Sequence, residues 1–266
     1  KLLEVTSLAR FAAPDHILYV REGSLLAHPF DPDTAKLRGD AVPLANKLGT
    51  SAVGLADFSV SDNGTLVYRS GWTANRRLVW VNRDGGAEAD LDEPAVYRET
   101  ALSPDGSRLA VVIDDPHTNN RDIWLRDLEH GLTSRFTFDP GRDHSPVFSP
   151  DGQTIAFISN RVDGTNALYL KGVSGSGAEK VFPDAEGIAV IGDWSRDGRW
   201  LAFFRTDKET AWDIWALAMD GPDKGQVTPI AQGPFIEIRP SFSPDGRWIV
   251  YESDESGRAE VYVQPF

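Results

Sequence analysis

Side chains that could carry out nucleophilic or metal chemistry are sparse in this sequence. It contains no cysteine, which excludes thiol catalysis, disulfides and thiolate metal sites. The histidines are scattered, and no two have the H-x-x-x-H spacing that places two metal ligands on one helix face. The segment GVSGSG at 172–177 resembles a nucleophile elbow, but no serine in it has glycine at both −2 and +2. We therefore predict a turn at 172–177, and no catalytic residue, metal site or cofactor in the chain.

A second group of polar residues is better suited to binding than to catalysis. A serine begins a turn sequence that recurs five times in the chain, and the group consists of the residues five and four positions before each of these serines. The residue pairs are Ala56/Asp57, Arg98/Glu99, His144/Ser145, Val190/Ile191 and Ile238/Arg239. If those turns belong to one ring of sheets, the pairs surround the mouth of its central opening, and convergent polar groups in a concavity favour a binding site. Alternatively, they are the ordinary charges of surface loops.

The residues expected to bind a ligand come from this group and from the acidic residue that precedes two of the pairs. They are Arg98, Glu99, Asp143, His144, Glu237 and Arg239. We expect these charges to be exposed, so that truncating an arginine among them leaves the stability of the fold nearly unchanged.

The repeated turn sequence occurs five times, as SDNG at 61–64, SPDG at 103–106 and 149–152, SRDG at 195–198 and SPDG at 243–246. Proline presets φ, aspartate bonds its own backbone and glycine accepts a positive φ, which is typical of a tight connection between two strands. The turn glycines are 42, 46, 46 and 48 residues apart. A period in the forties with β-type patterning predicts the blades of a β-propeller.

Each repeat predicts four strands, the third of which falls at 121–128, 166–173, 212–219 and 259–266. A degenerate unit precedes the five turns, with His16 in the place of the glycine. We thus predict an all-β fold, a six-bladed propeller in one domain, 1–266, with repeat units of about 13–55, 56–97, 98–143, 144–189, 190–237 and 238–266.

The last unit stops after its third strand, and the apolar segment 2–7 is expected to supply the fourth strand and close the ring. Closure removes the open sheet edges that a linear stack would expose. The alternative is a seven-bladed ring of which part is missing from this chain.

Composition narrows the possible partners. The net charge is −13, which is unfavourable for nucleic acid, since affinity for a phosphate backbone comes from lysine and arginine. No apolar run approaches the roughly 18 residues needed to cross a bilayer, so we expect no membrane insertion by this chain. It begins at Lys1 without a signal-peptide pattern, which we interpret as an excised domain or a mature form.

The repeated phrase FSPDG…(I/L)AF…SN…(D/A)IW resembles the WD40-like or PD40 repeat of TolB-type β-propellers, which is also found in tricorn and prolyl-oligopeptidase-type peptidases. Longer runs, among them HILYVREGSLLAHPFDP at 16–32 and 242–266, are similar to the propellers fused behind bacterial serine/threonine protein kinases. No kinase signature occurs in the chain itself.

This resemblance implies a non-catalytic binding or sensing module of a larger bacterial signalling protein, with a protein, peptide or small ligand at the channel mouth. A kinase tethered outside the chain would then be a partner, and a periplasmic or cell-surface location is favoured over the cytoplasm. The alternative is the propeller that gates substrate entry in a prolyl-oligopeptidase- or tricorn-type serine peptidase.

Overall fold

The computed structural model describes residues 2–3, 9–21, 23–45, 58–70, 77–81, 87–91, 95–115, 118, 120–175, 179–182, 187–207 and 210–266. These residues form 24 strands, which in chain order are β1 (Ala9–Ala12), β2 (His16–Arg21), β3 (Ser24–Asp31), β4 (Lys36–Leu37), β5 (Val42–Ala45), β6 (Phe58–Val60), β7 (Leu66–Ser70), β8 (Arg77–Val81), β9 (Ala87–Asp90), β10 (Tyr97–Leu102), β11 (Arg108–Asp114), β12 (Arg121–Asp127), β13 (Thr133–Arg135), β14 (Asp143–Phe148), β15 (Thr154–Val162), β16 (Thr165–Gly172), β17 (Lys180–Val181), β18 (Val190–Trp194), β19 (Trp200–Thr206), β20 (Trp212–Ala218), β21 (Val227–Ala231), β22 (Glu237–Phe242), β23 (Trp248–Ser253) and β24 (Glu260–Pro265).

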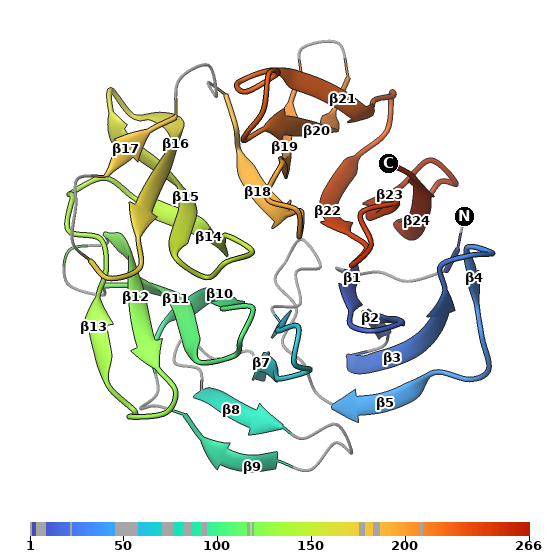
Figure 1. Cartoon of the computed structure of the whole chain (residues 1–266), viewed down its shortest axis with the longest axis horizontal. Helices are drawn as coiled ribbons and strands as arrows, with labels where there is room; N and C mark the ends of the chain where they lie inside the picture. The colour runs from blue at the N-terminus through green and yellow to red at the C-terminus, as the bar shows by residue number, and fades with distance from the viewer. Residues whose placement is uncertain are drawn as a thin grey trace.

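The strands form six antiparallel sheets arranged as the blades of a propeller (Figure 1). Blade 1 contains β1 to β5, and blades 2 to 5 contain β6–β9, β10–β13, β14–β17 and β18–β21, each in chain order. Blade 6 contains β22, β23 and β24. The first strand of each blade is innermost, and these inner strands contact one another around the ring, as β10 does with β6 and β14. The predicted six-bladed, all-β fold is confirmed.

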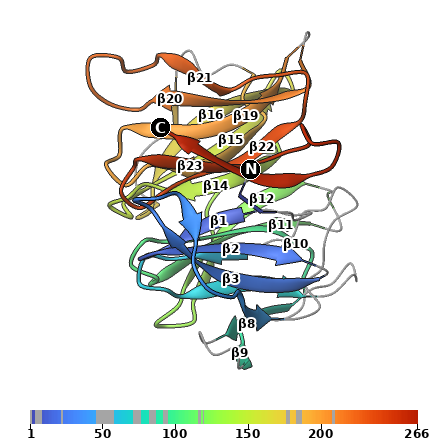
Figure 2. The same ribbon diagram turned by 90° about the vertical axis from the view of Figure 1, so that its right-hand side faces the viewer.

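Backbone hydrogen bonds link the amino-terminal residues to the last blade. Leu3 pairs antiparallel with Val261 of β24, and the Val261 amide donates to the Leu3 carbonyl at 3.0 Å. The two ends of the chain accordingly lie side by side in both views (Figures 1 and 2). Leu2 and Leu3 are thus placed where the predicted closing strand should be, whereas residues 4–8 of that segment lie outside the described part of the chain.

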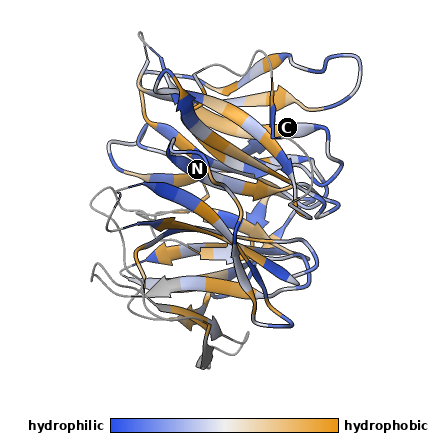
Figure 3. Ribbon diagram, turned by 90° about the vertical axis from the view of Figure 1, so that its left-hand side faces the viewer, coloured by the Kyte–Doolittle hydropathy of each residue, from blue (hydrophilic) through white to orange (hydrophobic). Residues whose placement is uncertain are grey.

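The core consists of six apolar clusters, one at each boundary between neighbouring blades. The last cluster joins blade 6 to blade 1, where Leu3, Ile17 and Tyr19 pack with Val250 and Val261. Apolar and polar residues alternate along many strands (Figure 3), so each blade presents a hydrophobic face to its neighbour. The stability of each blade therefore depends on the blades beside it.

The repeated turns join the first and second strands of blades 2 to 6. In the turn of blade 4, Ser149 Oγ donates to Asp151 Oδ1 at 2.5 Å, and the Thr154 amide donates back to Ser149 Oγ at 2.9 Å. Gly152 has φ of 68°, the left-handed region that favours glycine. The serine hydrogen bond, followed by the Gln153 amide, holds the pKa of Asp151 below its usual value. In the described residues, no helix is long and apolar enough to cross a membrane.

Candidate functional site

The inner strands of blades 3 to 6 share an irregularity near their first residues. Their pairing register shifts between Tyr97 and Thr100 in β10 and at the matching places in β14, β18 and β22. In two of these bulges a non-glycine residue has a positive φ, 52° at Ser145 and 59° at Arg239. A bulge bends a strand and redirects its side chains. Among the bulged residues, Thr100, Ser145 and Arg239 line the cavity described next.

A cavity of about 750 Å³ lies at this end of the ring and is lined by all six blades. Its wall on blade 5 is apolar and includes Val190, Phe204 and Trp212, and Ile238 of blade 6 continues this apolar surface. Blade 6 also contributes charged residues, namely Arg239, Glu252, Asp254 and Arg258. The rings of Phe204 and Trp212 meet edge to face, with centroids 5.6 Å apart. Such a volume and lining are in the range of small-molecule and peptide side-chain pockets.

The opposite wall, on blade 3, is charged. Arg98 and Arg121 approach the carboxylate of Asp114 at 2.5 and 2.9 Å. Burial raises the pKa of Asp114, but the two guanidinium groups outweigh burial and bring that pKa below its usual value. The neighbouring Glu99 accepts a hydrogen bond from the Ser145 amide at 2.6 Å, which ties the wall to the bulge of blade 4. The cavity is therefore amphipathic, with an apolar surface on blade 5 and charged residues on blades 3 and 6.

Three of the six predicted ligand-binding residues line this cavity, namely Arg98, Glu99 and Arg239. The expectation that these charges are exposed is wrong for Arg239, which is 6% exposed and approaches Glu252 Oε2 at 2.5 Å. Its position inside the bulge directs the side chain back between the strands. His144 is not among the lining residues; its Nδ1 lies 3.1 Å from Ser145 Oγ, and burial lowers its pKa.

The other two predicted residues are the first residues of inner strands β14 and β22 and do not line the cavity. Asp143 is fully buried and forms an ion pair with Arg161 at 3.0 Å, and burial raises its pKa. Glu237 is 4% exposed, and burial together with Asp213, Asp254 and Glu255 raises its pKa to about 7. The pair Ala56/Asp57 lies outside the described residues.

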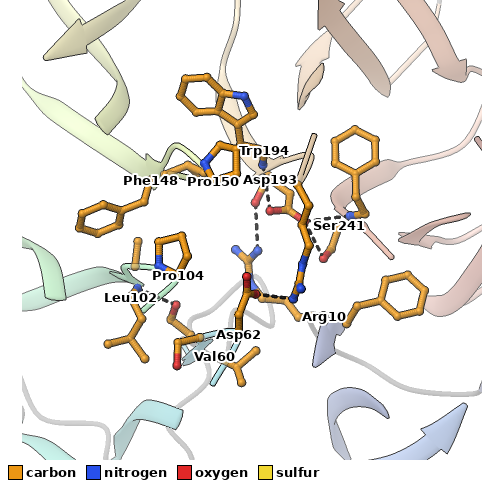
Figure 4. Close-up of a pocket in the computed structure, with 18 of the residues that line it drawn as sticks. Arg10, Val60, Asp62, Leu102, Pro104, Phe148, Pro150, Asp193, Trp194 and Ser241 are labelled. Atoms are coloured by element: carbon orange, nitrogen blue, oxygen red, sulfur yellow. Dashed lines mark hydrogen bonds and ion pairs between the residues drawn. The ribbon is translucent and has the colours of Figure 1, made fainter. Parts of the chain in front are cut away.

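The centre of the ring narrows at Arg10, a residue of β1 that the sequence reasoning missed. Its guanidinium donates to the Gly192 carbonyl of blade 5 at 3.0 Å. Beside it, the Asp193 carboxylate accepts hydrogen bonds from Ser241 Oγ and the Phe242 amide at 2.9 and 2.8 Å (Figure 4). Burial raises the pKa of Asp193, while Arg10 opposes that rise. Arg10 and Gly192 border the large cavity on one side and a smaller one on the other.

The smaller cavity, of about 130 Å³, lies among the repeated turns (Figure 4). Turn prolines Pro104, Pro150 and Pro244 line it, and Arg196 of blade 5 forms an ion pair with Asp62 of blade 2 across it. This end of the ring is therefore narrow and cross-linked, which makes the opposite end the candidate binding face.

Sequence reasoning also missed the apolar wall. Phe204 and Trp212 belong to the second and third strands of blade 5, whereas only the inner strands were expected to contribute. The signal available for Trp212 was a large aromatic residue at the start of a third strand, directly after a loop. For Arg10, the signal was its place before the degenerate turn, four positions ahead of Pro14. The GVSGSG segment leaves β16 and turns at 173–174, and residues 176–177 lie outside the described range.

Comparison with known proteins agrees with this architecture. The model of the TolB β-propeller domain family matches residues 93–224. The crystal structure of TolB from Acinetobacter baumannii superposes with a TM-score of 0.69 at 19% identity, covering 92% of this chain and 58% of that one. The chain has the propeller fold of the TolB type. At such identity the likeness concerns the fold alone.

Two relatives by sequence are peptidases by name. Uncharacterized peptidase YuxL of Bacillus subtilis is 28% identical over 217 residues, which are 65% of this chain and 33% of that protein. Tricorn protease homolog 1 of Streptomyces coelicolor is 28% identical over 166 residues, which are 58% of this chain and 15% of that protein. The chain therefore spans a third or less of either relative. In the described residues, no group of three or more histidine, aspartate or glutamate side chains is arranged to hold a metal ion.

Proposed function

We propose that this chain is a non-catalytic binding module whose ligand enters the cavity at the bulged end of the ring. The observation that carries the proposal is the amphipathic cavity of about 750 Å³, to which every blade contributes. An apolar group of the ligand would pack against Phe204, Trp212 and Ile238, and a polar group would face Arg98 and Arg121. The partner is a peptide or small molecule with both characters, and we propose that the module acts within a larger protein.

The structure suggests how such a ligand would be selected. Asp114 shares its charge between Arg98 and Arg121, so these two partly exposed cations stay paired when the ligand is absent and can also donate to a carboxylate or a carbonyl oxygen. On the other wall, binding energy would come from removing apolar surface from water. A ligand that lacks either half would lose the corresponding contribution.

The second candidate function is a propeller that admits substrate to a peptidase. It is favoured by the names of the relatives YuxL and Tricorn protease homolog 1, which extend well beyond the matched region. In that case the cavity would hold a segment of a peptide substrate, and catalytic residues would belong to another domain. A kinase-linked signalling role and an extracytoplasmic location remain part of the first proposal.

A cavity-filling variant tests the proposed site. A library of short peptides and small carboxylic acids is screened for ligands by thermal shift, and the affinities of the hits are then measured with the unaltered protein and with Ile238→Arg. We expect the variant to lose binding, because the new side chain occupies the space beside Trp212. The matched control is Val227→Arg, on β21 at the outer edge of blade 5. Equal loss in both variants, or undiminished binding by Ile238→Arg, would count against the cavity.

A further inference from the structure

At the boundary between blades 5 and 6, Glu237 and Asp213 form no ion pair within the described residues, although Arg205 is the cross-strand neighbour of Asp213 and Arg258 pairs with Glu260 nearby. The matching acids elsewhere in the ring are neutralised by cations. Between blades 3 and 4, Asp143 pairs with Arg161 at 3.0 Å, and Asp122 pairs with Arg135 at 2.8 Å. Arg161 also pairs with Glu179, which in turn accepts from Lys171 at 3.0 Å. Each of these three carboxylates therefore faces at least one cation.

The repeat places Glu237 where blade 4 has Asp143, and Glu255 where blade 4 has Arg161. In the sequence, Glu237 follows Asp143, and Glu255 follows Arg161, by the same number of residues as turn glycine Gly246 follows Gly152. Backbone geometry supports the match. The Arg142 amide donates to the Asn160 side chain at 2.7 Å, and the Ile236 amide donates to the Asp254 side chain at 2.8 Å. One boundary thus has an arginine where the other has a second acid.

Asp213 is the counterpart of Asp122. Each is the second residue of the third strand in its blade, and in the sheet each lies opposite the residue that comes seven positions after the turn glycine of the same blade. Asp213 is fully buried and accepts a hydrogen bond from Thr210. Within the described residues, however, its Oδ1 and the Oε2 of Glu237 have no hydrogen-bond partner. Both atoms are buried, and leaving such groups unpaired is costly. Two unpartnered carboxylate oxygens at one boundary indicate a missing donor.

The rings that accompany the arginine in blade 4 are also present in blade 6. The Arg161 guanidinium lies over the rings of Tyr169 and Phe157, at 4.3 and 5.6 Å from their centroids. The matching pair in blade 6 is Tyr262 and Tyr251, which stack with centroids 5.9 Å apart, as Phe157 and Tyr169 do at 5.7 Å. Burial, followed by Glu255 and Glu237, raises the pKa of Tyr251 to about 12. The acids and the aromatic rings are therefore close neighbours.

We propose that the boundary of blades 5 and 6 binds a guanidinium group supplied by a partner, in the place that Arg161 fills in blade 4. The site consists of Glu237 and Asp213 inside, with Asp254 and Glu255 at the rim. The guanidinium would donate to the two unpartnered oxygens and rest against the tyrosine rings, as planar cations do. Beside the rim, Phe235 and Ile236 are 37% and 40% exposed, so an arginine flanked by apolar residues on a protein or peptide is the partner that fits best.

This inference goes beyond the proposed function, because neither Glu237 nor Asp213 lines the large cavity. Asp254 borders both places, so a bound peptide could reach from one to the other. Variants at Ile238 test the cavity, and variants at Glu237 and Glu255 test the guanidinium site. Failure of one set leaves the other result standing.

The test is a calorimetric titration of the protein with N-acetyl-arginine amide, alongside the neutral citrulline analogue. We expect saturable binding of the arginine compound and none of the analogue. Glu237→Gln should weaken binding about tenfold, the factor associated with one charge-assisted hydrogen bond. Glu129→Gln, which removes an exposed acid from the β12–β13 turn, is the charge-matched control and should bind as the unaltered protein does.

Glu255→Arg provides an independent test, because it rebuilds the blade 4 arrangement within the chain. Residue 255 is exposed at the β23–β24 hairpin, so the variant should fold. We expect it to melt at a higher temperature and to lose arginine binding, while Glu255→Gln gives smaller changes in both. Equal binding of the citrulline analogue, tighter binding of calcium chloride than of the arginine compound, or a less stable Glu255→Arg variant that still binds arginine would overturn the proposal.

Discussion

The two ends of the ring are built from the same inner strands but organised differently. At the turn end, blades 3 to 6 repeat one arrangement, in which serine donates to aspartate at 2.5 to 2.6 Å and glycine accepts a positive φ. The cavity there is about 130 Å³ and an ion pair crosses it. At the bulged end the cavity is about 750 Å³, and its lining differs from blade to blade.

The comparison distinguishes residues that maintain the fold from residues that are available to bind a ligand. Residues that recur in blades 3 to 6 make the hydrogen bonds of the turns. Residues that vary between blades face the large cavity, where six different side-chain sets make an asymmetric surface. The recurring residues therefore predict the fold, whereas the residues that differ between blades indicate where the binding site is.

The largest effect is expected at the bulged end, from Arg239→Ala. This change leaves Glu252 buried without its guanidinium partner, and breaking a buried pair costs about 3–5 kcal/mol. Chemical denaturation would measure the loss. The double variant Arg239→Met with Glu252→Leu should recover much of the stability, because no unpaired charge remains. An Arg239→Ala protein as stable as the unaltered one would show that this end is as tolerant as ordinary surface.

The next effect concerns the turn end. Gly152→Val places a β-branched residue at a φ of 68°, and such strain costs roughly 1–3 kcal/mol. The melting temperature should fall while ligand affinity at the cavity stays the same. Gln153→Val, the same new residue at the adjoining exposed position, is the control. Equal destabilisation by both would remove the special role of the glycine, and lost affinity with unchanged stability would make the turn part of the site.

A pH effect should follow from Glu237. Its pKa of about 7 exceeds the usual value of 4.5, so the folded protein retains a proton that the unfolded chain releases. Stability contributed by protonated Glu237 is therefore present at low pH and is lost as the pH rises from about 4.5 through 7. Melting temperatures between pH 5 and pH 8 should fall more for the unaltered protein than for Glu237→Gln. Parallel profiles would mean that the neighbouring acids Asp213, Asp254 and Glu255 do not perturb it.

The smallest effect on stability is expected from Arg98→Ala. The Arg98 side chain is 43% exposed, and Arg121 remains on Asp114, so the cost should be within about 1 kcal/mol. Binding of a carboxylate-bearing ligand should nevertheless weaken and become less sensitive to salt, because the charged wall has lost one cation. Lys36→Ala, which removes a cation from blade 1, serves as the control. Identical salt dependence for both variants would argue against the charged wall.

The sequence was sufficient for the fold because the turn is a local signal repeated at a constant interval. Serine, aspartate and glycine in SPDG satisfy one another within six residues, so nothing distant is needed to recognise them. The third strands likewise lie close to their predicted places, with β12 at Arg121–Asp127 and β20 at Trp212–Ala218.

The candidate site was less accessible to the same reasoning because its geometry depends on bulges and on contacts between blades. The bulge that buries Arg239 against Glu252 is a shift in strand pairing, and the position of the arginine relative to the turn does not reveal it. Nor does spacing along the chain show that Arg10 reaches Gly192 on blade 5. Counting back from the turns located the rim of the cavity but not the direction of its side chains.

The hydrogen bond from Arg10 to Gly192 and the ion pair of Arg196 with Asp62 have a consequence for how the molecule melts. In a repeat array that interacts only with nearest neighbours, cooperativity decays with the number of units between two sites. Both contacts join blades that are not adjacent, and both end on blade 5. Fraying that starts in blade 5 would thus be transmitted directly to blades 1 and 2, so the ring should unfold as a single thermodynamic unit rather than from one edge.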